Sequence, residues 1–239
     1  MRIHRFYIED IDKLYPGDTY VTQEADLIHQ LKNVFRFKVG QKMIMFNQNV
    51  GELEAELIQI GKKDMSFKCV RHIRIIEGGD DIKTKVSLYM SIIKNSNFDL
   101  VVEKAVELGI KKIIPIITER TIKNDLNMNR LNRIIKEATE QSGRLDLMSV
   151  DNTVSFIDSL DKSKNENDIV YFGSIGSEEG VKNIDVKYKN IAVFIGPEGG
   201  FSDDEIDMFI HSDIKPARLG SHVLRAETAA IVACGILSI

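Results

Sequence analysis

The pattern of apolar and polar positions changes in character near residue 80. Before that point, short apolar segments are separated by turn residues, which is typical of β-strands. This pattern predicts strands over residues 43–46, 53–60 and 65–71, and apolar residues at helical spacing predict one helix over 26–36. The first part of the chain is therefore predicted to form a small β-barrel with a single helix.

Beyond residue 84, apolar runs alternate with helical patterns. Strands are predicted over 86–93, 113–117, 169–172 and 191–195, and helices over 98–108, 128–142, 203–211 and an apolar terminal stretch, 228–239. Such alternation is typical of an α/β domain with a largely parallel sheet. A polar stretch with paired glycines separates the two patterns. We therefore expect a domain at 1–75, a linker at 76–84 and a second domain at 85–239.

Composition excludes several classes of protein. With 239 residues, 43% of them hydrophobic and 28% charged, the chain lies in the globular range. Cys69 and Cys234 are far apart in sequence, and the five histidines have no partners at metal-ligand spacing, so neither a disulfide framework nor a metallohydrolase is expected. The N-terminus lacks the apolar core of a signal peptide, and residues 228–239 are too few to span a bilayer. A cytoplasmic protein without metal or membrane is expected.

The net charge of −4 conceals a gradient along the chain. Residues 1–75, 76–110, 111–144 and 145–239 carry net charges of +2, −2, +4 and −8. A basic front half joined to an acidic back half suits a protein that contacts a polyanion with one part only. Ordinary solvated faces with chance clustering explain the same numbers, so charge alone leaves both interpretations open.

A glycine-rich loop is expected at the end of the strand over 191–195. It reads Gly196-Pro197-Glu198-Gly199-Gly200-Phe201-Ser202, which lets backbone approach a ligand closely. The helix after it begins with Ser202 and Glu205 at capping-box spacing. Because its first turn is Asp203-Asp204-Glu205, electrostatics disfavours a bound phosphate and favours a neutral or cationic ligand. Neither a P-loop nor a dinucleotide-binding glycine motif occurs in the chain.

A second candidate loop, residues 218–230, follows a short strand and enters the terminal helix. It combines Gly220 with a strongly placed cation, Arg225, close to Glu227. Loops at the carboxyl ends of neighbouring parallel strands converge, so both loops are expected at one site. An ion pair between Arg225 and Glu227 that stabilises the terminal helix is the alternative to a catalytic role.

Together, the two loops resemble the paired signature of the SPOUT methyltransferases. The matching residues are Gly196 to Ser202, followed by Leu219-Gly220, Val223-Leu224-Arg225 and Glu227-Thr228-Ala229. Within that superfamily the chain is similar to the ribosomal RNA small subunit methyltransferase E family, which makes N3-methyluridine in 16S rRNA. Further matches include His4 to Tyr7, Glu119-Arg120-Thr121 and Glu140 to Arg144, so the resemblance spans nearly the whole chain.

The resemblance implies a fold, a cofactor and an assembly. The fold is an N-terminal PUA-like RNA-binding barrel followed by an α/β domain with a deep trefoil knot at about residues 190–239. The implied cofactor is S-adenosyl-L-methionine, a sulfonium cation, which agrees with the acidic helix start beside the glycine-rich loop. The implied partners are 16S rRNA or the small ribosomal subunit and a second copy of the chain in a homodimer.

It also assigns candidate residues. Arg225 is the candidate for stabilising the uridine imide anion, with Glu198 or Glu227 as proton acceptor, although Glu198 could instead accept hydrogen bonds within its own loop. The residues that the resemblance places at the cofactor are Phe172, Gly173, Gly196, Pro197, Glu198, Gly199, Gly200, Leu219, Gly220, Val223, Leu224 and Thr228. The candidates for RNA phosphate contacts are His29, Arg36, Arg120 and Arg144, each with a surface salt bridge as its alternative.

Three positions depart from the pattern of the family. His222 stands where the family usually has Arg, Asn95 where it has Gly, and Gln41 where it has Asp. Two other functions stay open: a SPOUT enzyme that acts on another RNA site or on a ribose 2′-hydroxyl, and a non-catalytic RNA-binding or ribosome-assembly factor. The first would leave a product without a methyl on the pairing edge of the base, and the second would not bind the cofactor.

Overall fold

The computed structural model describes residues 3–75, 84–122, 125–174, 176–178, 180 and 189–238. The chain forms two compact units. Unit 1 comprises Met1–Asp81 and Thr139–Asp146, and unit 2 comprises Ile82–Ala138 and Leu147–Ile239. The expected linker at 76–84 lies, except for residue 84, outside the described residues. Residues 139–146 lie well beyond the change of pattern near residue 80, yet they pack with the first unit.

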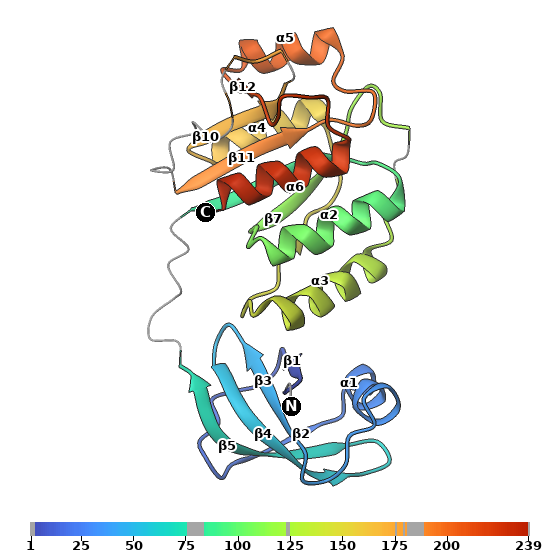
Figure 1. Cartoon of the computed structure of the whole chain (residues 1–239), viewed down its shortest axis with the longest axis vertical. Helices are drawn as coiled ribbons and strands as arrows, with labels where there is room; N and C mark the ends of the chain where they lie inside the picture. The colour runs from blue at the N-terminus through green and yellow to red at the C-terminus, as the bar shows by residue number, and fades with distance from the viewer. Residues whose placement is uncertain are drawn as a thin grey trace. The chain divides into compact units, whose positions relative to one another are not determined.

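Unit 1 is built on a five-stranded sheet that forms a half-barrel (Figure 1). The strand order is β1-β3-β4-β5-β2, with β1 parallel to β3 and the other pairs antiparallel. The bounds are β1 Arg5–Tyr7, β2 Thr19–Thr22, β3 Lys42–Asn47, β4 Gly51–Ile60 and β5 Met65–Arg74. The three strands predicted for this region are therefore confirmed, and the short β1 and β2 are additional.

The helix predicted over 26–36 is shorter and wider than expected. An α-helix, α1 Ala25–His29, continues as a π-helical turn, η1 Gln30–Val34, in which the Phe35 N–H donates to the Gln30 carbonyl at 3.0 Å. Arg36 follows with a φ of 55°, a left-handed backbone conformation that ends the helix and that residues other than glycine rarely adopt. Leu27, Ile28 and Leu31 still face the core of the unit.

Charged residues on β3, β4 and β5 form an ion-pair group in unit 1, in which the carboxylate is buried and the two cations are exposed. The Glu54 carboxylate is 4% exposed and contacts Lys42 Nζ and Arg71 Nε, each at 2.7 Å. These hydrogen bonds hold the pKa of Glu54 below its ordinary value. In the same unit, the Glu140 side chain accepts from the Tyr7 N–H at 3.1 Å, and its carbonyl accepts from Arg5. Residues 139–146 are thereby hydrogen-bonded to β1.

Unit 2 is an α/β domain around a parallel sheet, as the sequence predicts. The strand order is β12-β10-β11-β6-β7-β8, with β9 also paired to β7, and all these pairs are parallel. The bounds are β6 Lys85–Ser91, β7 Lys112–Ile117, β8 Ser149–Val150, β9 Val154–Ser155, β10 Ile169–Gly173, β11 Asn190–Ile195 and β12 Lys215–Ala217. The four long strands coincide with those predicted.

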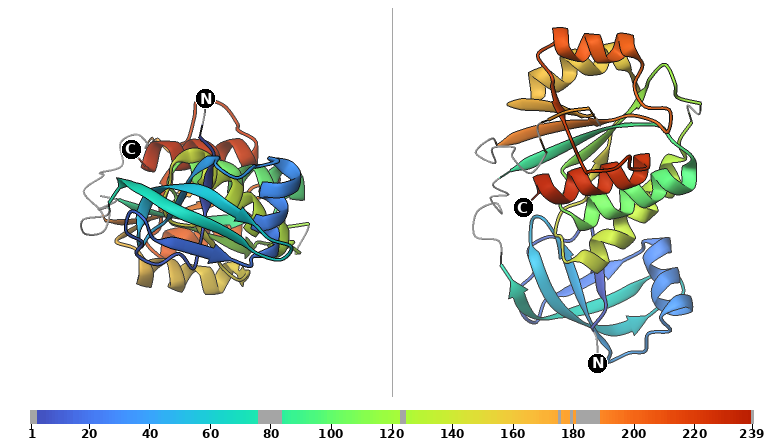
Figure 2. Two further views of the ribbon diagram at one scale, coloured as in Figure 1. Left: turned by 90° about the horizontal axis from the view of Figure 1, so that it is seen from below. Right: turned by 45° about the horizontal axis from the view of Figure 1, so that its top comes forward.

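Helices cover both faces of this sheet (Figures 1 and 2). The first face packs against α2 Asn95–Glu107, α3 Met128–Ser142 and α6 Ala226–Leu237, through residues such as Leu88, Val102 and Val193. The second face packs against α4 Phe156–Glu166 and α5 Asp203–His211, where Phe172 stacks on Phe209 and Phe194 meets Phe209 edge-on. The alternation of faces along each strand produces two apolar layers.

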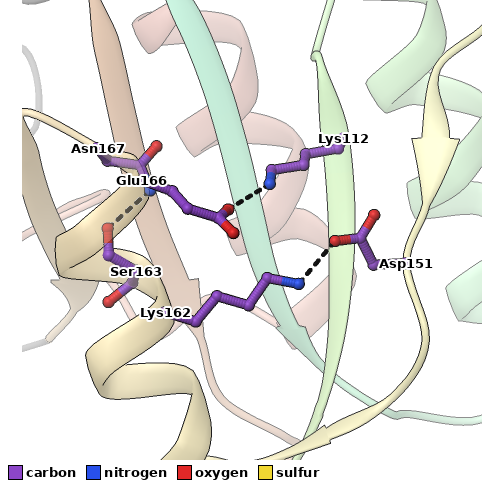
Figure 3. A network of polar contacts seen from close by, with 6 residues as sticks. All are labelled: Lys112, Asp151, Lys162, Ser163, Glu166 and Asn167. Atoms are coloured by element: carbon purple, nitrogen blue, oxygen red, sulfur yellow. Dashed lines mark hydrogen bonds and ion pairs between the residues drawn. The ribbon is translucent and has the colours of Figure 1, made fainter.

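The second face also carries a polar network, which Figure 3 shows from close by. Lys112 on β7 is paired with Glu166 at the end of α4, and Lys162 on α4 contacts Asp151 at 2.8 Å. Asn167 Nδ2 donates to the Ser163 carbonyl at 2.8 Å and so closes the last turn of the helix. The network holds α4 to the amino-terminal half of β7.

Cys69 and Cys234 are both free thiols and buried, and burial raises the pKa of the Cys234 thiol to about 12. Among the residues described by the structure, no group of three or more His, Cys, Asp or Glu could hold a metal ion. None of the described helices has the length and apolar character needed to cross a bilayer.

Candidate active site

A cavity of about 530 Å³ lies in unit 2 at the carboxyl ends of three neighbouring strands. Residues that end or directly follow β10, β11 and β12 line it, among them Gly173, Ile195 and Arg218. Because the sheet is parallel, the loops leaving these strands meet at the same edge. Asn97 on α2 and the first residues of α6 complete the lining. The two candidate loops therefore share one site, as expected.

Glycines keep the floor of the cavity open. A Cβ atom on Gly196 would lie 3.3 Å from the Gly200 carbonyl carbon and from two ring carbons of Phe201. A Cβ on Gly173 would lie 3.2 Å from Leu219 Cδ1. Gly200 has a φ of +70°, a conformation that L-residues rarely adopt. The backbone at these positions can thus approach a ligand more closely than one that carries side chains.

The predicted capping box at the start of α5 is confirmed. Ser202 Oγ accepts from the Glu205 N–H at 3.3 Å, and Glu205 Oε2 accepts from the Ser202 N–H at 2.9 Å. Both residues are buried, with Glu205 5% exposed. The glycine-rich loop, residues 196–202, therefore ends in a firmly anchored helix.

The second loop, residues 218–225, is much more open. Val223 is 74% exposed, and Arg218, His222 and Arg225 are exposed as well. Ser221 Oγ and His222 Nδ1 lie 3.0 Å apart. At its start, Arg218 forms a parallel bridge with Gly180 of the connection between β10 and β11. The loop contributes polar and apolar side chains to the cavity without being packed beneath other elements.

Arg225 and Glu227 do not form the ion pair considered as their alternative role. Both side chains line the cavity, and within the described parts of the chain neither has an ion-pair partner. Arg225 is the N-cap residue of α6, so its backbone lies at the positive end of that helix. The site thereby combines an uncompensated cation with the carboxylates Glu198 and Glu227.

Most of the residues predicted for the cofactor line this cavity. They are Gly173, Gly196, Pro197, Glu198, Gly200, Leu219, Gly220, Val223 and Leu224. Phe172 lies instead in the apolar layer below α5, Gly199 faces Arg120, and Thr228 is exposed on α6 outside the lining. The residues not assigned from sequence are Asn97, Ser174, Ile195, Phe201, Arg218, His222, Ala226 and Ala229. For Ser174, Ile195 and Arg218, adjacency to a strand end was the available signal; Asn97 had none.

The four candidate RNA contacts have different surroundings. His29 and Arg36 are exposed in unit 1. The Arg144 side chain is 9% exposed and forms a two-point pair with Asp146, with nitrogen–oxygen distances of 2.9 and 2.8 Å. Arg120 is exposed, but its Nη1 donates to the Gly199 carbonyl at 2.7 Å and to the Phe201 carbonyl at 3.3 Å. Arg144 and Arg120 therefore have partners within their own units.

The three departures from the family pattern lie in different places. His222 lines the cavity, and Asn95 begins α2. Gln41 stands directly before β3, where its side-chain oxygen accepts from the Lys38 N–H at 2.6 Å and stabilises a turn. Of the three, only His222 belongs to the cavity lining, so it is the departure that bears on the site.

Comparison with known proteins identifies methyltransferases as relatives over nearly the whole chain. A family model of the RNA methyltransferase domain matches residues 80–238. The ribosomal RNA small subunit methyltransferase E of Rickettsia conorii is 33% identical over 237 residues, which cover 98% of this chain and 94% of the relative.

Two solved structures that contain bound S-adenosylmethionine are also similar. A methyltransferase from Legionella pneumophila is 27% identical with a TM-score of 0.88, covering 99% of this chain and 97% of its own. A ribosomal RNA small subunit methyltransferase E from Neisseria gonorrhoeae is 26% identical with a TM-score of 0.84, covering 98% and 95%. From the extent of these matches, the chain belongs to the RNA methyltransferase domain family and, within it, to the ribosomal RNA small subunit methyltransferase E family.

Proposed function

We propose that this protein transfers a methyl group from S-adenosylmethionine to N3 of a uridine in the 16S rRNA of the small ribosomal subunit. Family membership supports the reaction class, and the names of its relatives support small-subunit rRNA as substrate. The observation that carries the proposal is Arg225, an exposed cation in the cavity wall that lacks an ion-pair partner among the described residues.

The residues of the cavity fit the cofactor. The glycines at 173 and 196 leave space where a Cβ would press on Leu219, Gly200 and Phe201, and the cavity volume is in the range that holds a ligand of this size. The carboxylates of Glu198 and Glu227 suit a cationic ligand. S-adenosylmethionine supplies an activated methyl group on a sulfonium. Residues that would hold it are Gly173, Gly196, Pro197, Gly200, Leu219, Gly220 and Leu224.

The protein's own contribution to the reaction concerns the uridine. N3 carries a weakly acidic imide proton, and its loss leaves negative charge on N3 and on the neighbouring carbonyl oxygens. The Arg225 guanidinium, reinforced by the amino-terminal end of α6, can stabilise that charge. Glu198 or Glu227 accepts the proton; both line the same cavity as Arg225.

Access to N3 places a condition on the RNA. N3 lies on the pairing edge of uracil, so the target base must be unpaired or extruded from its helix. The half-barrel of unit 1 supports a PUA-like RNA-binding barrel, with the exposed His29 and Arg36 as phosphate contacts. In the same proposal Arg144 acts through its pair with Asp146, by shaping the surface of residues 139–146.

The remaining features of the family are part of the proposal. The trefoil knot of the family, at about residues 190–239, is one of them. The homodimer and the cytoplasmic location that the resemblance implies are the others.

Nucleoside mass spectrometry tests the function directly. We expect purified protein, S-adenosylmethionine and unmethylated 16S rRNA or small subunits to yield N3-methyluridine, and a strain without the gene to lack that nucleoside. A methylated ribose, or methylation of another RNA, would contradict the N3 assignment. Absence of any affinity for S-adenosylmethionine would contradict catalysis and favour a ribosome-assembly factor.

A further inference from the structure

The turn that follows β7, residues 118–121, holds the glycine-rich loop from outside the cavity. Arg120 Nη1 donates to the carbonyls of Gly199 and Phe201 at 2.7 and 3.3 Å. Its aliphatic part packs on Gly199, where a Cβ would lie 3.3 Å from Arg120 Cδ and 3.4 Å from its Cβ. The neighbouring residues Pro197, Glu198 and Gly200 line the cavity. Arg120 is therefore attached to the back of the loop whose front faces the ligand.

A second link joins the same turn to the loop. Glu205 Oε1 accepts from the Glu119 N–H at 2.8 Å, while its other oxygen accepts from the Ser202 N–H at 2.9 Å. One buried carboxylate thus connects the turn after β7 with the first residue of the helix cap. Hydrogen bonds to a charged acceptor are stronger than those between neutral groups, so this link is a strong one.

The turn itself is held in place by hydroxyl groups. The Thr118 N–H donates to Thr121 Oγ1 at 2.9 Å, and the two threonine hydroxyl oxygens lie 2.8 Å apart. Ser91 Oγ, at the end of β6, is 3.4 Å from Thr118 Oγ1. Hydrogen bonds therefore run from the end of β6 through the turn after β7 to the glycine-rich loop. The loop is thus connected to β6 and β7 in addition to β11, which it follows.

Loops rich in glycine lose much conformational freedom when they bind a ligand, so holding one in a single conformation increases affinity. We propose that Arg120 is a positioning residue for the methyl donor: with Glu205, it holds residues 196–202 in the conformation that receives S-adenosylmethionine. This inference rests on the proposed function of the cavity. It gives Arg120 a role different from the RNA phosphate contact that its charge and sequence context suggest.

The experiment compares Arg120→Ala with Arg120→Lys and with a control, Arg133→Ala, at an exposed position on α3. Hydrogen–deuterium exchange of residues 196–205 is measured in the protein without cofactor. Calorimetry gives the Kd for S-adenosylmethionine, and filter binding at several salt concentrations gives the affinity for a 16S rRNA fragment. Glu205→Gln is a second variant. Its amide oxygen can replace one carboxylate oxygen, but its NH₂ cannot accept a hydrogen bond from the second N–H group.

If Arg120 positions the loop, Arg120→Ala speeds exchange of residues 196–205 and raises the Kd for S-adenosylmethionine about tenfold, the loss expected for charged hydrogen bonds. Arg120→Lys recovers part of the affinity, and Glu205→Gln speeds exchange of the same residues. The salt dependence of RNA binding stays that of the wild type. Arg133→Ala changes none of these quantities.

Two results overturn the inference. In the first, Arg120→Ala leaves both the exchange of residues 196–205 and the Kd unchanged. In the second, the variant leaves that Kd unchanged but lowers the slope of log affinity against log salt by about one, which identifies a phosphate contact. Wild-type protein that neither binds S-adenosylmethionine nor methylates RNA refutes the proposed function instead, and the exchange data still decide whether Arg120 holds the loop.

Discussion

The two loops that enclose the cavity differ in how they are held. Residues 196–202 have the Ser202 capping box behind them and hydrogen bonds from Arg120 to two of their carbonyls. Residues 218–225 expose Val223 to 74% and carry Arg225 without an ion-pair partner among the described residues. One wall of the site is thus preorganised, and the other keeps its side chains available.

The difference suits two ligands of unlike character. A small cofactor gains affinity from a wall whose conformation is set before binding. An RNA substrate must bring a base out of its own structure, and a wall with exposed side chains can contact the base as it arrives. We therefore expect substitutions in the first wall to affect mainly the Kd of S-adenosylmethionine, and those in the second mainly the methyl transfer step or the KM for RNA.

Arg225→Ala should give the largest effect. Removal of the cation that we propose stabilises the imide anion should lower kcat by about 10²–10³, the usual loss for such an electrostatic contact. The Kd for S-adenosylmethionine should stay within about threefold, because the loop at 196–202 keeps its hydrogen bonds. Single-turnover methylation and calorimetry measure the two quantities. Arg225→Lys, which keeps the charge, should lose less of kcat.

Equal losses of cofactor affinity and of kcat in Arg225→Ala would contradict the assignment of cofactor binding to the first wall and methyl transfer to the second. Near-normal turnover would remove Arg225 from the reaction. In that case the carboxylates Glu198 and Glu227 would be the only charged candidates left from the sequence-predicted catalytic set.

Gly196→Ala and Gly220→Ala form a matched pair, with one glycine in each loop. In the first, the new Cβ would lie 3.3 Å from backbone of Gly200, which the capping box and Arg120 prevent from moving. In the second, the three nearest atoms would be side-chain atoms of Leu224 at 3.5–3.7 Å, an ordinary contact. Gly196→Ala should therefore raise the Kd for S-adenosylmethionine about tenfold or more, and Gly220→Ala less than about threefold.

Calorimetry on both variants, with thermal unfolding as the check on folding, measures this difference. Comparable Kd values for the two variants would mean that the loops are equally adaptable. The comparison between a preorganised and an available wall would then fail.

Features with local signals were the ones that the sequence predicted well. The long strands of the parallel sheet and the helices α3 and α5 occupy their predicted positions, because apolar periodicity and the Ser202–Glu205 spacing are visible within a few residues. The glycine-rich loop and Arg225 likewise lie in one cavity. A strand-to-helix loop that carries its own cap needs no distant residue to be recognised.

Features that depend on buried polar residues or on contacts between distant positions were missed. Helix α4 buries Ser159 and Ser163 together with Phe156 and Leu160, and the hydroxyls donate to carbonyls three residues earlier, so its apolar periodicity is broken. The contact of Arg120 with Gly199 joins residues 79 positions apart, and no local pattern predicts it. From sequence, the charge of Arg120 indicated a contact with RNA phosphate. In the fold, its guanidinium donates to two backbone carbonyls instead.

Val223→Ser should give the smallest effect, and it examines the second wall alone. Val223 lines the cavity and is 74% exposed, so its isopropyl group is available for contact with a base that enters. Burial of a valine side chain contributes at most about 1.5–3 kcal/mol, and partial burial less, so we expect the KM for RNA to rise about three- to fivefold. The Kd for S-adenosylmethionine and the melting temperature should not change. Ile157→Ser, 66% exposed on α4 and outside the cavity lining, is the control and should leave the KM for RNA unaltered. A shift in cofactor affinity without a change in the KM for RNA would place Val223 with the first wall, and the two walls would then share the cofactor.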